Sequence, residues 1–208
     1  GLHGANRLGG NAQAECLVFG RIAGERAAER AKEVGLGEVK EDTILEERER
    51  VFAALNRREG IHARGLKEQI QDIMMEYVGP LRSEEGLRKA LSALKEIKEK
   101  VDCLSTQGKS RIMNFEWMEA LEISSMVELA LVMAEGALFR TESRESHYRE
   151  DYPEHFPGGD NKDWAVETVV SSKDRKIRID KVPVKFEEIK PGEFEVKKVD
   201  VPYQTFKA

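Results

Sequence analysis

Apolar residues recur at helical spacing over most of the chain up to Ser143. In a stretch rich in Ala, Glu and Arg that begins at Asn11, Leu17, Val18 and Ile22 follow this pattern, and Gly35 is a typical residue to end the helix. The pattern predicts further helices within residues 43–58, 62–80, 83–104 and from about 114 to 143. We therefore expect a mainly α protein built around an antiparallel bundle of three or four helices joined by short loops.

Local signals indicate where these helices begin and end. Thr43 is a candidate cap for the second helix, and Gly79-Pro80 is a typical end for the third. Ser83 stands in a capping position before the fourth helix, where Glu84 and Glu85 suit the positive end of the helix dipole. The sequence thus predicts separate helices rather than one long helix.

Small and flexible residues within the helices suggest how they pack. Gly20 and Gly24 lie four apart inside the first helix, where each costs about 1 kcal/mol relative to Ala. Close packing against another backbone explains them better than a weak helix, although a weak helix is the alternative. The methionines fall largely at helical positions, and we expect them to fill the core: Met74, Met75, Met113, Met118, Met126 and Met133.

The character of the sequence changes near His147. Aromatic residues, Pro, Gly and Asp over residues 147–164 indicate an irregular loop. Two stretches rich in β-branched residues follow on either side of a short polar turn, which predicts a β hairpin, and the rest is expected to be an extended tail. We divide the chain into residues 1–38, a helical bundle over residues 39–150, and a loop, hairpin and tail over residues 151–208.

The composition limits the classes of partner. The chain has 208 residues, and its formal net charge of -5 gives no electrostatic reason to expect binding to nucleic acid. No apolar run reaches the roughly 18–20 residues of a membrane-spanning helix. Cys16 and Cys103 lie far apart in unrelated contexts, so we expect reduced thiols, no metal site and a cytoplasmic protein.

The first stretch, GLHGANRLGGNAQ, is rich in glycine and leads directly into a helix. Such a loop lets the backbone approach a ligand closely, and the start of a helix presents free N–H groups and a positive dipole end. Arg7 could bind a carboxylate through two parallel hydrogen bonds. The alternative is a flexible turn or an expression remnant, and the spacing alone does not decide between them.

Three separate blocks resemble one protein family. GLHGANRLGGN followed by AECLVFGRIAGERAAE, then VGPLRSEEGL, then LFRTESRESHYREDYP are similar to the succinate dehydrogenase and fumarate reductase flavoproteins, a family that L-aspartate oxidase shares. The resemblance covers roughly residues 1–165. It implies that residues 1–38 are the last segment of an FAD-binding domain, and that the bundle and the hairpin lie C-terminal to it.

The resemblance also implies roles for residues near the start of the chain. Arg7 would bind a carboxylate of the dicarboxylate substrate beside the flavin. The backbone amides of Asn11, Ala12 and Gln13 would face the pyrimidine edge of the flavin, and His3 would either pack near the flavin or order the loop.

Further polar residues would anchor the helical domain to the flavin-binding domain. These residues lie at or after the end of the last predicted helix, and the alternative is that they form a solvated charged surface. One departure is that Glu145 stands where the family usually has Gly in ESRGAH, which leaves the turn geometry open. The anchor residues are Arg140, Arg144, His147 and Arg149, with Glu150 and Asp151 beside them.

The resemblance implies that the chain is the C-terminal part of a larger polypeptide. The dinucleotide-binding unit with its glycine fingerprint and the capping domain have no counterpart in this sequence. We expect the chain alone to be inactive, to bind FAD weakly or not at all, and to self-associate through exposed apolar surface. The parent protein would interconvert succinate and fumarate with FAD and exchange electrons with an iron–sulfur subunit. L-Aspartate oxidase is one alternative, and a non-catalytic module that docks subunits is another.

Overall fold

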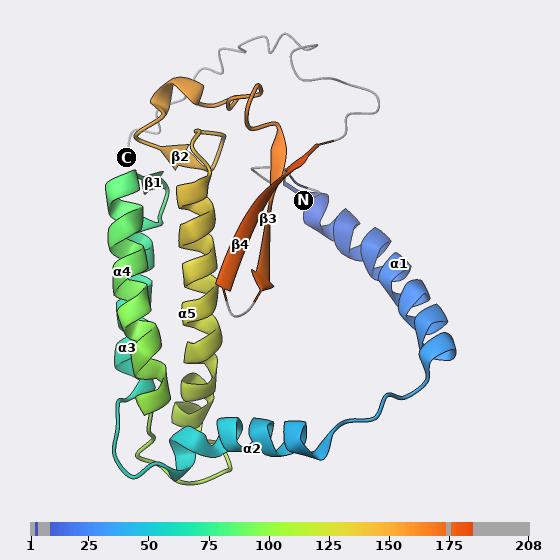
Figure 1. Cartoon of the computed structure of the whole chain (residues 1–208), viewed down its shortest axis with the longest axis vertical. Coiled ribbons are helices and arrows are strands. Elements are labelled where there is room, and N and C mark those ends of the chain that lie inside the picture. Colours follow the sequence, from blue (N-terminus) through green and yellow to red (C-terminus); the bar gives the residue numbers. More distant parts are fainter. Residues whose placement is uncertain (1–2, 4–8, 174–175, 185–208) are drawn as a thin grey trace, which may run out of the picture.

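The computed structural model describes residue 3 and residues 9–173 and 176–184, and within them the protein is mainly helical (Figure 1). The expected fold class is confirmed. The helices are α1 (Asn11–Val34), α2 (Glu41–Asn56), α3 (Ala63–Tyr77), α4 (Glu84–Lys100) and α5 (Phe115–Phe139). Short 3-10 turns cover Val101–Cys103 and Pro153–His155.

Helices α3, α4 and α5 pack side by side into the bundle that holds the core (Figure 1). Leu87, Leu94 and Ile123 are completely buried there, and burial of each such side chain stabilises the fold by about 1.5–3 kcal/mol. Helix α2 crosses one end of the bundle, where the indole of Trp117 on α5 donates to the Val51 carbonyl at 2.8 Å. This hydrogen bond ties α2 to the bundle.

One of the two predicted N-terminal caps is present and the other is not. The Ser83 hydroxyl accepts from the Gly86 amide at 3.2 Å, and Asn114, which was not predicted as a cap, caps α5 in the same way. Thr43 is not a cap, because α2 begins at Glu41 and Lys40 precedes it without a side-chain cap. Acidic residues in the first turn of α2 take over the electrostatic part of that role.

The expectation for the methionines is largely wrong. Met74 and Met126 pack against the core, but Met75, Met113, Met118 and Met133 are exposed. The buried positions of α5 are taken mainly by small and branched residues, which allow close approach of neighbouring helices: Ala120, Ile123, Val127, Ala130, Leu131 and Ala134.

Two small strand pairs complete the described fold. β1 (Leu81–Arg82) and β2 (Tyr148–Arg149) pair in parallel, which joins the segment before α4 to the segment after α5. β3 (Val166–Lys173) and β4 (Lys176–Pro183) form the predicted antiparallel hairpin and contact α5. The predicted tail beyond residue 184 lies outside the described residues.

Helix α1 lies apart from the bundle (Figure 1) and buries none of its residues. Its apolar side chains are exposed, with Leu17 at 76% and Phe19 at 49%. A Cβ added to Gly20 or Gly24 would meet nothing within 4 Å, so close packing of these glycines stays a prediction, as do the domain boundaries. No helix of the described residues has the length and apolar character to cross a membrane.

Candidate functional site

The predicted ligand-facing segment is described only in part. Arg7 lies outside the described residues. His3 is half-buried, and its Nε2 pairs with the Glu15 carboxylate in the second turn of α1. This contact joins His3 to α1, and the role expected for His3 beside the flavin or in the loop stays a prediction.

Among the described residues, no side chain caps the start of α1. Gly10 precedes the helix in a left-handed conformation (φ 85°), provides no side-chain cap, and no acidic residue occupies the first turn. The Gln13 amide donates to the Gly10 carbonyl at 3.2 Å, whereas the amides of Asn11 and Ala12 are too early in the helix to have an intrahelical acceptor. The arrangement suits an electron-rich or anionic group.

A second polar cluster gathers at the end of α5 and centres on Glu142. This carboxylate is completely buried and accepts from Arg140 at 2.7 Å and from Arg144 at 2.9 and 3.0 Å. The Asp160 amide donates to it at 2.7 Å. Burial by itself raises the pKa of Glu142, but the hydrogen bonds from Arg144, the Asp160 amide and Arg140 outweigh it, so the pKa lies below its usual range.

Arg149 is also completely buried, and it caps the C-terminal end of α5. Its guanidinium donates to the carbonyls of Ala137 at 2.9 Å and of Leu138 and Arg140 at 3.3 Å. It also pairs with Asp151 at 2.8 Å. Because these carbonyls are orphan acceptors at a helix end, Arg149 supplies the donors that a helix C-terminus lacks.

His147 has one defined tautomer within this cluster. A guanidinium can only donate, so Arg82 donates to Nδ1 at 2.8 Å, and Nε2–H then donates to the Arg140 carbonyl at 3.1 Å. Burial, together with the charges of Arg82, Arg140 and Arg149, lowers the pKa of His147 to about 4. The ring is therefore neutral at neutral pH.

The same cluster reaches the hairpin. Arg140 donates to the carbonyls of Trp164 at 2.8 Å and Val166 at 3.2 Å, and it lies over the Trp164 ring. The Nζ atom of Lys181 on β4 lies 3.3 Å from the centre of the Trp164 ring. The polar cluster thus joins α5, the loop that follows it and the hairpin.

The structure brings the four predicted anchor residues together within this chain. Arg140, Arg144, His147 and Arg149 share one network, although contact with another domain stays a prediction. Sequence reasoning missed Glu142. A signal was available, because Glu142 has an arginine two residues away on either side. A carboxylate that is buried between two guanidinium groups can form an ion pair with both.

The turn at Glu145 keeps a left-handed backbone, with φ 47°. Close by, the left-handed Gly159 (φ 78°) packs against the Arg144 guanidinium, and a Cβ there would lie 2.2 Å from its Cζ. Both positions favour glycine, and this chain has glycine at only one of them.

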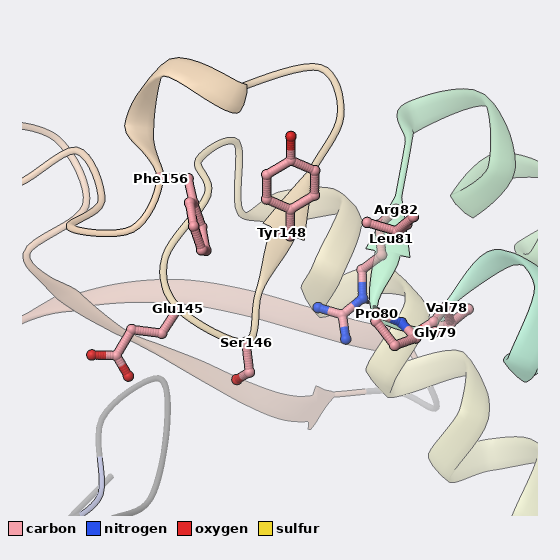
Figure 2. A pocket seen from close by; sticks show the side chains of 9 residues that line it. All are labelled: Val78, Gly79, Pro80, Leu81, Arg82, Glu145, Ser146, Tyr148 and Phe156. Atoms are coloured by element: carbon pink, nitrogen blue, oxygen red, sulfur yellow. Dashed lines mark hydrogen bonds between the residues drawn. The ribbon is translucent and has the colours of Figure 1, made fainter. Parts of the chain in front are cut away.

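A cavity of about 600 Å³ opens beside the β1–β2 pair. Figure 2 shows Pro80, Leu81 and Arg82 on one side of it and Tyr148 and Phe156 on the other. Among the described residues, none of those expected to contact flavin or substrate lines this cavity.

Comparisons with known proteins agree over most of the chain. A family model described as the C-terminal region of the fumarate reductase flavoprotein matches residues 67–198. An uncharacterised FAD-dependent oxidoreductase of Methanocaldococcus jannaschii is 37% identical over 155 residues, which are 74% of this chain and 27% of that protein. One subunit of the fumarate reductase (CoM/CoB) of Methanothermobacter marburgensis is 37% identical over 157 residues, which are 76% of this chain and 28% of that protein.

Solved structures show the same architecture. A quinol fumarate reductase of E. coli has a TM-score of 0.83 and 30% identity, covering 93% of this chain and 33% of that one. An adenylylsulfate reductase of Archaeoglobus fulgidus has a TM-score of 0.68 at 24% identity, which shows a shared fold alone, over 80% of this chain and 28% of that one. The chain therefore spans between about a quarter and a third of the length of these proteins.

Proposed function

Because the chain belongs to the fumarate reductase flavoprotein C-terminal family, we propose that it is the C-terminal part of an FAD-dependent flavoprotein subunit that interconverts succinate and fumarate. The observation that carries the proposal is the glycine-rich segment leading into the uncapped start of α1, in a chain whose relatives are fumarate reductase and succinate dehydrogenase flavoprotein subunits. The flavoprotein would lie at the cytoplasmic face of a membrane and exchange electrons with an iron–sulfur subunit.

The residues at the start of α1 fit a flavin. Bound FAD supplies the hydride chemistry between succinate and fumarate. The amides of Asn11 and Ala12 face the electron-rich pyrimidine edge, and the amide of Gln13 lies beside them while it donates to the Gly10 carbonyl. The positive end of the helix dipole stabilises negative charge there. The left-handed Gly10 and the absence of acidic residues in the first turn support this role.

Arg7 binds the substrate. Its guanidinium donates two parallel hydrogen bonds to one carboxylate of the dicarboxylate, which holds the reacting carbons against the flavin and stabilises charge on the substrate. His3, paired with Glu15, orders the segment that carries Arg7.

Helix α1 belongs to the FAD-binding domain in this proposal. Its exposed apolar residues, including Leu17 and Phe19, are what a helix shows when the domain it packs against is elsewhere in the polypeptide. Without the dinucleotide-binding and capping domains the chain alone would be inactive and poor at binding FAD, and the exposed face would make it prone to self-association. Arg140, Arg144, His147 and Arg149 would then fix the bundle to that domain.

The test uses the full polypeptide that carries this chain. A purified protein with a flavin absorbance that succinate or dithionite bleaches supports the proposal. Arg7→Gln should keep the flavin and lower kcat/KM for fumarate by roughly 100-fold or more, the cost of a lost bidentate charge-assisted contact. The matched control is Arg21→Gln, because Arg21 is an exposed arginine of α1 that pairs with Glu25. Equal turnover by both variants would refute the role of Arg7.

Two alternatives give different results in the same preparation. An L-aspartate oxidase would reduce its flavin with L-aspartate, reoxidise it with oxygen and need no iron–sulfur partner. A docking module that takes no part in catalysis would be colourless and would keep its partner subunits in the Arg7→Gln variant.

A further inference from the structure

The cavity beside the β1–β2 pair has an apolar wall and a charged residue at one side. Pro80 and Leu81 form one side, and Tyr148 and Phe156, whose rings meet edge to face at 5.4 Å, form the other. Leu81 is 62% exposed and Phe156 50% exposed, so apolar surface remains uncovered at the mouth. A volume of about 600 Å³ is typical of sites for small ligands.

Arg82 differs from the other arginines of this region. Arg140, Arg144 and Arg149 each pair with a carboxylate. Arg82 instead donates from Nε to the Val78 carbonyl at 3.1 Å and from Nη1 to His147, and no carboxylate among the described residues forms an ion pair with it.

The guanidinium of Arg82 projects into the space between the two sides of the cavity (Figure 2). Its two hydrogen bonds fix its orientation, and no other described residue accepts from its remaining N–H groups. Burial and the charge of Arg149 lower the pKa of Arg82. Glu145 also lines the cavity, but its side chain extends away from Arg82 in Figure 2.

We propose that this cavity binds a carboxylate carried on an apolar or aromatic body. Arg82 donates to the carboxylate, and Tyr148, Phe156 and Pro80 pack against the body. The fixed guanidinium loses little entropy on binding, and the carboxylate compensates a charge that the described residues leave without an ion pair. None of the cavity residues belongs to the flavin or substrate segment, and the site shares with the proposed function only the contact of Arg82 with His147.

The test is calorimetric titration of the full polypeptide that carries this chain with phenylpropionate and with its neutral amide. The carboxylate should bind at least roughly tenfold more tightly than the amide, as expected for one charge-assisted contact. Arg82→Gln should abolish this preference. Arg88→Gln is the matched control, because Arg88 is an exposed arginine on α4 that pairs with Glu84.

Loss of binding in Arg82→Gln could also follow from a disturbed turn. Leu81→Glu removes this ambiguity, since it places a negative charge at the exposed mouth and keeps the hydrogen bonds of Arg82. It should weaken the binding of phenylpropionate more than that of the amide, because Leu81 lines the cavity for both probes and only the carboxylate meets the added charge. Equal binding of both probes to the unmodified protein, or full binding by Leu81→Glu, would overturn the proposal.

Two further titrations identify which site holds phenylpropionate and whether the natural ligand is a small molecule or the end of a polypeptide. Binding that disappears in Arg7→Gln but persists in Arg82→Gln belongs to the proposed substrate site and overturns the inference. A peptide ending in a free phenylalanine carboxylate, compared with its amidated form, tests a polypeptide end as the source. If phenylpropionate binds more tightly than this peptide, the natural ligand is a small molecule.

Discussion

Replacing Glu145 by glycine should stabilise the protein. Glu145 has a φ of 47°, and a left-handed conformation costs a residue with a Cβ roughly 1–2 kcal/mol. Glycine avoids this cost but loses about 0.4–1 kcal/mol through the greater freedom of its unfolded chain. The backbone amide of residue 145, which donates to the Pro157 carbonyl at 3.1 Å, is unchanged. The net gain in the free energy of unfolding is therefore about 0.5–1 kcal/mol.

Urea unfolding followed by tryptophan fluorescence measures this gain. With a typical dependence of about 2 kcal/mol per molar urea, the midpoint should rise by roughly 0.2–0.5 M. The control is Glu145→Ala, which removes the carboxylate but keeps the Cβ, and which should leave the midpoint close to that of the unmodified chain. If the glycine variant is no more stable than the alanine variant, the backbone at this turn is not strained and the reasoning fails.

Three other measurements test the polar cluster and a cap. Gly159→Ala should destabilise the fold by at least about 1–2 kcal/mol, because the new Cβ meets the Arg144 guanidinium and φ is 78°; an unchanged urea midpoint would contradict this. His147 has a folded pKa of about 4, below its ordinary 6.5, so its stabilising contribution is complete above pH 6.5 and falls as the pH drops toward 4, by up to about 3 kcal/mol. Urea titrations at several pH values should show this slope, and His147→Gln should lack it. Asn114→Ala should cost at least about 1 kcal/mol, because it removes the α5 cap and the amide donations to the Gly108 and Ser110 carbonyls. Thermal unfolding against Asn114→Asp, which keeps the acceptor and lacks the donors, separates the share of the cap.

The sequence predicted best what depends on neighbouring residues. The Ser83 cap and the hairpin follow from local patterns, and the structure has them. The prediction that Thr43 caps α2 is wrong, because α2 begins two residues earlier. Glu41 supplies favourable charge there, and no side-chain cap is present. The local sequence indicates that a helix begins in this region. Two starts that lie two residues apart differ too little in free energy for the sequence to tell which one is used.

The prediction that the methionines fill the core is largely wrong for a different reason. Helix α5 is apolar on nearly all sides, so its periodicity does not mark the buried face, and exposed Met118 and Met133 look like core residues in sequence. The polar cluster was predicted only as a group of residues in one stretch. Its partners Asp160 and Trp164 come from a later loop, and tertiary contacts of this kind leave no local pattern.

The capping of α5 by Arg149 has a consequence for synthesis of the protein. The last carbonyls of this central helix receive their donors from a residue that leaves the ribosome about ten residues later. Glu142 accepts from the Asp160 amide, and Arg140 donates to the Trp164 carbonyl, later still. A nascent chain that has not reached the hairpin holds a bundle whose longest helix is unfinished at one end. The end of α5 therefore gains its full set of hydrogen bonds only after residues 149–164 have been made.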